Sequence, residues 1–154
     1  MRYSVLPLLL LSMPLLTMSC SGSSEDKWTA QRPDTFPAAG IVTFDGKPLP
    51  EATVVFQSTG GEPHAAVGRT DENGEFQLRT FTDGDGAIAG EHKVTVVCSR
   101  TEGPPEGANL DEANVVIQEV SLIPERYADP AKSGLTASVT PGQENKFTFH
   151  LDKE

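Results

Sequence analysis

The chain has 154 residues, 37% of them apolar, and it carries 22 acidic against 12 basic side chains. This length suffices for one domain, and so acidic a chain offers few of the Lys and Arg side chains that neutralise phosphates, which argues against nucleic acid as a partner. The composition is uneven, because all three methionines and seven of the thirteen leucines lie within residues 1–19. This leading segment therefore differs in kind from the rest of the chain.

Residues 1–19 have the three parts of a secretory signal peptide. Arg2 gives a positive start, a mostly apolar run follows from Val5 to Met18, and small residues end it. A membrane-spanning helix needs about 18 or more apolar residues, whereas this run has about 14 and is interrupted by Pro7 and Pro14. We therefore predict that residues 1–19 direct export and are then cleaved off.

The predicted cleavage point falls at a cysteine. The sequence Thr17-Met18-Ser19-Cys20 resembles a bacterial lipobox, in which the cysteine becomes the mature N-terminus and carries diacylglycerol on its sulfur, although Thr17 stands where a leucine is usual. Each buried CH2 of an acyl chain such as palmitate contributes about 0.8 kcal/mol. We therefore predict that Cys20 is lipidated and anchors the protein to a membrane. The alternative is ordinary signal-peptide cleavage after Ser19 or Ser21, which would release a secreted soluble protein.

Residues 20–37 are predicted to form a flexible tether. They show no apolar periodicity, and Ser, Gly, Asp, Glu and Pro dominate them, which is typical of linkers that bury little apolar surface. The folded domain is therefore predicted over residues 38–154.

The rest of the chain alternates short β-type runs with turn sequences. Residues 20–154 hold 11 valines, 4 isoleucines and 13 threonines against 6 leucines, a balance that favours strands. The dipeptides Asp45-Gly46 and Asn73-Gly74 are typical of tight turns. Strands are predicted at residues 41–44, 53–57, 67–70, 75–79, 92–100, 135–139 and 146–151. Each is apolar on one face only, so the sequence predicts an all-β, seven-stranded antiparallel sandwich of the immunoglobulin-like kind.

One stretch needs separate treatment. Residues 101–124 combine a Gly/Pro/Glu segment with a run of mixed helical and strand character, and they are predicted to be mostly loop, with one helical turn or an irregular edge strand.

Cys98 shares the alternation of Val94 and Val96, so it is predicted to be a buried core thiol rather than a nucleophile. If Cys20 is acylated, Cys98 has no disulfide partner within the chain.

Several motifs carry a resemblance to a known family. They are Gly40-Ile41-Val42-Thr43, Gly46-Lys47-Pro48-Leu49, Ala52-Thr53-Val54-Val55-Phe56, Thr70-Asp71, Gly86-Ala87, Pro124-Glu125-Arg126-Tyr127 and Ser133-Gly134-Leu135-Thr136. Together they resemble the carboxypeptidase regulatory-like domains, here of the exported bacterial lipoprotein kind, over about residues 40–151. Glu51 stands where a glycine is usual in that family, and His92 stands where an aromatic is usual. The resemblance implies a transthyretin-like sandwich that serves as an accessory module without activity of its own.

The residues themselves give no catalytic constellation. Zinc hydrolysis needs about three nitrogen or oxygen ligands and an open position, but His64, His92 and His150 fall on different predicted elements, and none has a Glu three residues later. We interpret His64, in a loop, and His150, on the polar face of its strand, as solvated histidines. The chain also has no Ser/His/Asp spacing and no phosphate-binding glycine motif, so we predict no enzymatic activity and no cofactor.

A calcium site is the sharper alternative. The sequence Asp83-Gly84-Asp85-Gly86 offers two carboxylates among glycines, and carboxylate oxygens are ligands that Ca2+ prefers. Asp/Gly turns form without metal, however, so no metal site is predicted, and Asp83 and Asp85 are the residues that a calcium site would use.

The sequence therefore predicts a non-catalytic β-sandwich that is exported and held by a lipid at the membrane of the bacterial cell envelope. Its expected partners are the membrane, through the N-terminal lipid, and an envelope protein or glycan, and a purely structural role stays open. A calcium-binding exported adhesion-type domain and an ordinary secreted soluble protein are the alternatives.

Overall fold

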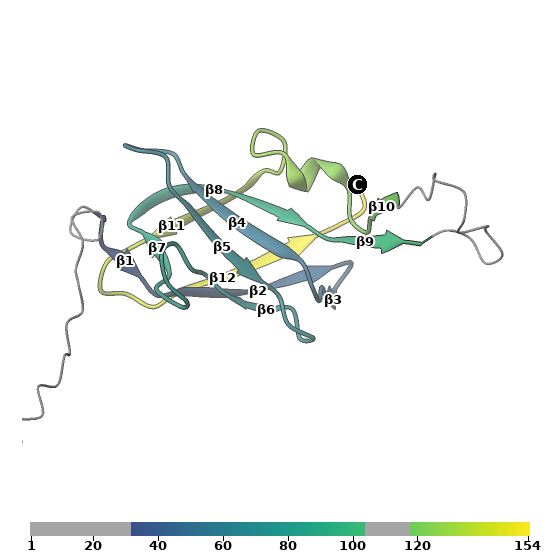
Figure 1. The fold of residues 1–154 in the computed structure, drawn as a ribbon, viewed down its shortest axis with the longest axis horizontal. Helices are drawn as coiled ribbons and strands as arrows, with labels where there is room; N and C mark the ends of the chain where they lie inside the picture. Colours follow the sequence, from purple (N-terminus) through teal and green to yellow (C-terminus); the bar gives the residue numbers. More distant parts are fainter. Residues whose placement is uncertain (1–31, 104–117) are drawn as a thin grey trace, which may run out of the picture. The chain divides into compact units, whose positions relative to one another are not determined.

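The computed structural model describes residues 32–103 and 118–154, almost entirely as β-strands (Figure 1). The predicted signal peptide, the lipidation residue Cys20 and the first part of the predicted tether lie outside the described residues. The strands are β1 Thr35–Phe36, β2 Ala38–Phe44, β3 Lys47–Pro48, β4 Thr53–Ser58, β5 Ala65–Arg69, β6 Glu75–Gln77, β7 Ala87–Ile88, β8 Gly90–Val97, β9 Ser99–Glu102, β10 Gln118–Ser121, β11 Leu135–Val139 and β12 Asn145–Leu151. A 3-10 helix, η2, spans Glu125–Ala128. In the part of the chain that the structure describes, no helix is long and apolar enough to cross a membrane.

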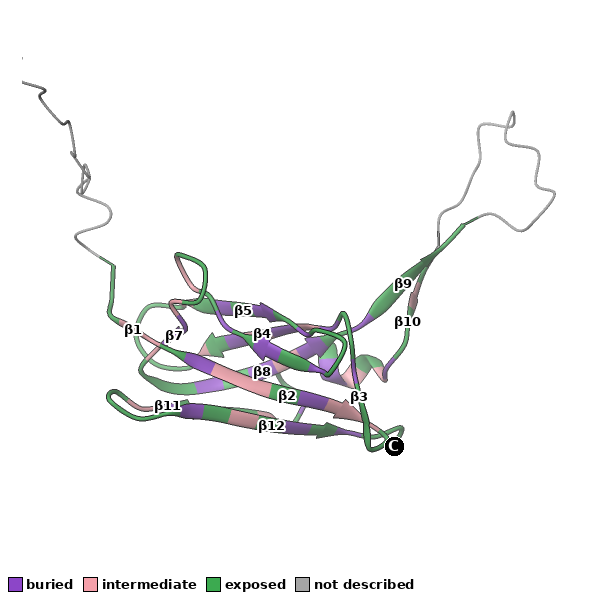
Figure 2. Cartoon of the chain, turned by 90° about the horizontal axis from the view of Figure 1, so that it is seen from below, coloured by how far each residue is buried: buried purple, intermediate pink, exposed green. Residues whose placement is uncertain are grey.

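Two sheets face one another across the core, which confirms the all-β sandwich. The first, here called the β8 sheet, has the strand order β11-β8-β4-β5. The second, the β2 sheet, has β12 on one side of β2 and both β3 and β6 on the other. Buried residues gather between the two sheets, while exposed ones cover their outer faces (Figure 2).

The core follows the predicted alternation. Its buried members include Val54 and Phe56 of β4, Val94 and Val96 of β8, and Ala137 and Val139 of β11. The ring of Phe56 lies at the centre, 5.2 Å from the ring of Phe147 and 5.9 Å from that of Phe149, between ring centroids. Strand β4 of one sheet thereby packs directly on β12 of the other.

The prediction of a wholly antiparallel sandwich is wrong at β12. This strand pairs in parallel with β2 along its whole length, from Asn145 opposite Ala38 to Leu151 opposite Phe44. Buried Asn145 fixes the register, because its Nδ2 donates to Pro37 O at 3.2 Å and its Oδ1 accepts from Thr140 N at 2.9 Å. The apolar alternation of a strand is the same for parallel and antiparallel neighbours, so it could not predict this direction.

The described part of the chain has twelve strands rather than seven, because β1, β3, β7, β9 and β10 add short pairings. Strand β1 pairs with β7, and Phe36 packs against the core, so ordered structure already begins within the predicted tether 20–37. The predicted strand 92–100 is divided at Cys98 into β8 and β9. Strand β9 forms with β10 an antiparallel arm that projects from the sandwich (Figure 2), and β10 is an edge strand within the stretch predicted to be mostly loop.

Glu51 has a left-handed backbone, with φ at 58°. This conformation costs a residue with a Cβ about 1–2 kcal/mol, and it gives a physical reason for a glycine at this position. Glu51 lies in the turn before β4, where its N–H donates to Thr70 O at 3.0 Å. The side chain adds only an exposed ion pair with Arg69, at 3.7 Å.

Replacing Glu51 by glycine is expected to raise the free energy of unfolding by about 0.5–1 kcal/mol. The relieved backbone strain is offset in part by the greater freedom of glycine in the unfolded chain, about 0.5–1 kcal/mol. Urea denaturation would measure the change. Glu51→Ala keeps the strained φ and should not stabilise; an equal gain in both variants would show that strain is not the cause.

Candidate functional site

The two carboxylates that a calcium site would use, Asp83 and Asp85, have other partners. Asp83 is exposed, and its Oδ1 forms an ion pair with Arg79 Nη1 at 3.0 Å. The carboxylate of Asp85 accepts hydrogen bonds from three backbone N–H groups, those of Thr80 at 2.7 Å and of Phe81 and Thr82 at 2.9 Å. Burial by itself would raise the pKa of Asp85, but these three hydrogen bonds lower it below its ordinary value. The carboxylate of Asp85 thus stabilises the backbone of the loop to which it belongs.

Nowhere in residues 32–103 and 118–154 do three or more His, Cys, Asp or Glu side chains form a group that could hold a metal ion. His64 and His150 lie on separate elements, His150 with its Nδ1 2.8 Å from Thr43 Oγ1.

His92, unlike His64 and His150, is buried in the core. Its side chain is only 2% exposed and lies inside the sandwich, with its ring 5.9 Å from that of Phe56. Its Nδ1 lies 3.0 Å from Gly90 O, so the neutral ring donates its Nδ1 proton there. Burial lowers the pKa of His92 and outweighs the hydrogen bond to Gly90 and the charge of Glu91, which act the other way. This residue occupies the place of a core aromatic side chain.

The free energy of unfolding is expected to decrease when the pH is lowered below about 6.5, the ordinary pKa of histidine. In this range His92 binds a proton in the unfolded chain but stays neutral in the folded domain. The stabilisation is fully present above that pH and is lost as the pH falls toward the lowered pKa of the folded state, with a slope of up to about 1.4 kcal/mol per pH unit. In His92→Phe this contribution should vanish, as urea unfolding at pH 7 and pH 5 would show. His64→Gln is the control and should keep the wild-type slope; an unchanged slope in His92→Phe would exclude His92 as its source.

Cys98 is a buried thiol, as predicted. It is 3% exposed, and its Sγ lies 3.7 Å from Pro50 O, within reach of a weak hydrogen bond. Burial raises the pKa of the Cys98 thiol, and the charge of Glu51 raises it further. A thiol with these properties is a poor nucleophile.

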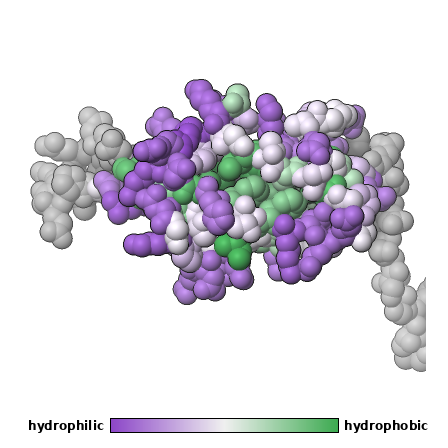
Figure 3. Space-filling model, turned by 180° about the vertical axis from the view of Figure 1, so that it is seen from behind, coloured by the Kyte–Doolittle hydropathy of each residue, from purple (hydrophilic) through white to green (hydrophobic). Residues whose placement is uncertain are grey.

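The candidate site is a shallow hollow on the outer face of the β2 sheet. Its volume is about 570 Å³, and it spans the three neighbouring strands β12, β2 and β6. Figure 3 shows this face, with an apolar area near its middle and hydrophilic side chains around it. The exposed apolar residue here is Ile41, at 37%.

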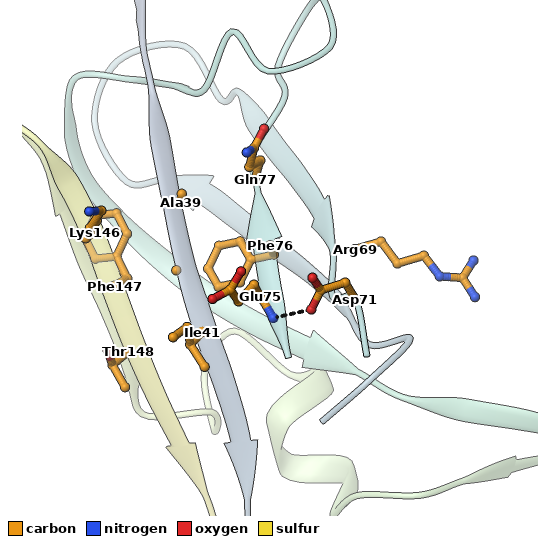
Figure 4. A pocket seen from close by; sticks show the side chains of 11 residues that line it. Ala39, Ile41, Arg69, Asp71, Glu75, Phe76, Gln77, Lys146, Phe147 and Thr148 are labelled. Carbon is orange, nitrogen blue, oxygen red and sulfur yellow. Dashed lines mark hydrogen bonds between the residues drawn. The ribbon is translucent and has the colours of Figure 1, made fainter. Parts of the chain in front are cut away.

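The strand register places six side chains on this face in two rows. Lys146, Ala39 and Gln77 form one row across β12, β2 and β6. Thr148, Ile41 and Glu75 form the next. Gly40 lies between the rows, directly opposite Phe147 of the neighbouring strand β12, and the ring of Phe76 lies close to the position that a Cβ at Gly40 would take. Figure 4 shows the side chains of the two rows and of Phe76. A Cβ at Gly40 would overlap both the carbonyl oxygen of Phe147 and the Phe76 ring, so the floor of the hollow depends on this glycine.

The polar residues that line the hollow, here called its rim, are Arg69, Asp71, Glu75, Gln77, Lys146 and Thr148. Only some of their side chains form hydrogen bonds or ion pairs. Asp71 accepts from the backbone N–H of Glu75 at 2.9 Å, and Arg69 points away from the hollow (Figure 4). Lys146 Nζ forms an exposed ion pair with Glu144 at 2.6 Å, and this contact raises the pKa of Lys146.

Three rim side chains have no such partner. Within residues 32–103 and 118–154, those of Glu75, Gln77 and Thr148 make no hydrogen bond or ion pair. Among the described residues, the rim therefore has a carboxylate, an amide and a hydroxyl that are not used by the fold.

This face was not singled out from the sequence. One signal was present, because Ile41 and Val42 are adjacent apolar residues on one strand, and successive side chains of a strand point to opposite faces. One of the two therefore had to face outward. Which neighbours would surround it depends on the pairing of β2 with β12 and β6, which are distant in sequence.

Comparisons with known proteins add one distant likeness. No protein-family model matches the chain, and no curated protein matches it. Among solved structures, a 9R-lipoxygenase from Cyanothece PCC8801 is similar over 79% of this chain, with 17% sequence identity and a TM-score of 0.37. The match covers 17% of the lipoxygenase chain, so this chain spans less than a fifth of that protein's length. A likeness at this level carries no inference about activity.

Proposed function

We propose that this chain is a non-catalytic, exported module of the bacterial cell envelope, anchored by a lipid at Cys20, that binds an envelope protein or glycan through the outer face of its β2 sheet. The observation that carries the binding role is the hollow around the exposed Ile41, which combines an apolar centre with a polar rim, because exposed apolar patches rimmed by polar residues mark interaction sites. The anchor is supported by the lipobox-like sequence ending at Cys20.

We further propose that the domain is of the carboxypeptidase regulatory-like, transthyretin-like type. Its conformation supports this at positions where the family has small residues. Glu51 has the positive φ that a glycine would adopt without strain, and Gly86 has a φ of 87°. The closing motifs also pack on the sandwich: the Tyr127 hydroxyl accepts from Asp152 N at 3.0 Å, and buried Ser133 Oγ donates to Val94 O at 2.7 Å.

The anchor is tested by membrane fractionation of bacteria that express the full chain. Cys20→Ala is expected to block lipidation and reduce the share of the protein in the membrane fraction, whereas inhibition of the lipoprotein signal peptidase is expected to leave the precursor uncleaved. Cys98→Ala is the matched control, since it removes the other thiol and should leave processing unchanged. Normal processing and membrane partition of Cys20→Ala would contradict the anchor.

The binding role is tested by placing a photo-crosslinking amino acid at position 41 of the full chain in the intact envelope. Adducts are expected from position 41. Position 67 is the control, because Val67 is 36% exposed on the outer face of the opposite sheet, almost the same as Ile41. If position 41 yields no adduct, the proposed use of this face fails.

A further inference from the structure

We infer that the occupant of this face is a second copy of the chain, paired face to face about a two-fold axis that passes over β2 between Ala39 and Ile41. The inference rests on the proposed binding role of the outer face of the β2 sheet, and it specifies a second copy of the chain as the partner that this face binds.

The charge pattern of the face is self-complementary. Lys146 and Glu75, of opposite charge, lie on either side of β2, one in each row of the register. With strands about 4.8 Å apart and about 3.3 Å per residue, they are roughly 10 Å apart across the strands and roughly 7 Å apart along them. The midpoint between them lies on β2 between Ala39 and Ile41. A two-fold axis that runs parallel to the sheet above this point, at right angles to the line from Lys146 to Glu75, sets Lys146 of each copy against Glu75 of the other and so forms two equivalent ion pairs.

The two rows carry no net charge, although the protein is acidic. The chain has a net charge of −10, which opposes association of two copies over most of the surface. Among the six side chains of the two rows, however, Lys146 and Glu75 balance one another, and the other four are uncharged. Two copies that meet through the two rows therefore meet less repulsion there than over the rest of the surface, and the added negative charges, Asp71 and Glu144, lie beside the rows.

The present partner of Lys146 does not oppose this arrangement. Its ion pair with Glu144 joins side chains that are 70% and 76% exposed, and pairs as exposed as these contribute little. Lys146 can therefore leave its ion pair with Glu144 and form one with Glu75 of a second copy at little cost in free energy. In the paired arrangement Ile41 lies near the axis and contacts its counterpart, so the exposed apolar centre becomes buried.

A second copy fits this face better than a glycan does. The side chains in the two rows include no aromatic ring, so a sugar would find no ring to stack on. The Phe76 ring lies beneath the strands and is 3% exposed.

The crosslinking experiment at position 41 decides between partners. A product of twice the mass of the chain, formed from position 41 and not from position 67, is the expected result. Adducts of position 41 with another protein or with glycan would overturn the pairing of two copies and still support the proposed binding role. The absence of any adduct at position 41 would overturn both.

Charge reversal tests the geometry of the pair. Lys146→Glu and Glu75→Lys are each expected to lower the yield of the crosslinked dimer about tenfold, because each sets like charges against one another. The double variant Lys146→Glu/Glu75→Lys restores opposite charges across the axis and should recover the wild-type yield. A double variant as weak as the single ones would overturn the proposed two-fold arrangement. Unfolding midpoints close to wild type would establish that all three variants are folded.

Discussion

Replacement of Thr70 by valine is expected to lower the free energy of unfolding by about 2–4 kcal/mol. The buried Thr70 hydroxyl donates to Leu49 O at 2.7 Å and accepts from Ala52 N at 2.8 Å. Valine has nearly the same shape but makes neither bond, so a backbone C=O and a backbone N–H are left without a partner in the interior. Each such group costs about 1–3 kcal/mol. In urea, the unfolding midpoint should fall while the slope of the transition stays the same.

Thr70→Ser keeps the hydroxyl and is the matched control. It removes one methyl group, so it should lose less than half of what the valine variant loses. If the two variants are equally destabilised, packing of the methyl group and not the pair of hydrogen bonds explains the role of Thr70.

Replacement of Gly86 by alanine is expected to lower the free energy of unfolding by about 2–4 kcal/mol. Gly86 has a φ of 87°, where a residue with a Cβ is strained by about 1–2 kcal/mol. In addition, a Cβ at this position would overlap the carbonyl oxygen of Phe36 and lie 2.8 Å from Pro37 Cα. The backbone of β1 must then move away from β7. Hydrogen exchange at the β1 and β7 amides should rise together with the loss of stability measured in urea.

Gly84 provides the control within the same loop. Its φ is 74°, but nothing lies within 4 Å of the position that a Cβ would take. Gly84→Ala should therefore lose only the conformational contribution, about 1 kcal/mol, and leave exchange in β1 unchanged. If alanine lowers the free energy of unfolding equally at positions 84 and 86, steric contact between β1 and residue 86 does not contribute.

Prediction of the fold from the sequence succeeded where the residues of a single strand or turn indicate its structure. The alternation of Leu135, Ala137 and Val139 predicted β11 and its inner face, and Asp45-Gly46 predicted the turn after β2, where both residues have positive φ. Prediction failed where the answer depends on a distant neighbour. The direction of β12 and the pairing of β1 with β7 are set by contacts that no local pattern encodes.

The candidate site was harder to predict for the same reason. Asp83 and Asp85 stood out as a pair of carboxylates, but their partners include Arg79 and the backbone of residues 80–82, and a turn sequence does not reveal how its oxygens are used. The hollow around Ile41 combines side chains from three strands, two of which lie about 35 and 105 residues further along the chain. Hydrophobic alternation could predict that some residue of β2 faces outward, but not what surrounds it.

The parallel pairing of β12 with β2 has a consequence for biosynthesis. Residues 145–151 supply the long neighbour of β2, so β2, the first long strand of the described residues, cannot complete its sheet until residues 145–151 have also been made. Pairings this distant in sequence form slowly. A chain that completes its core late stays unfolded for longer. Under the export proposed above, the position of β12 would therefore favour folding after the chain has crossed the membrane rather than before it.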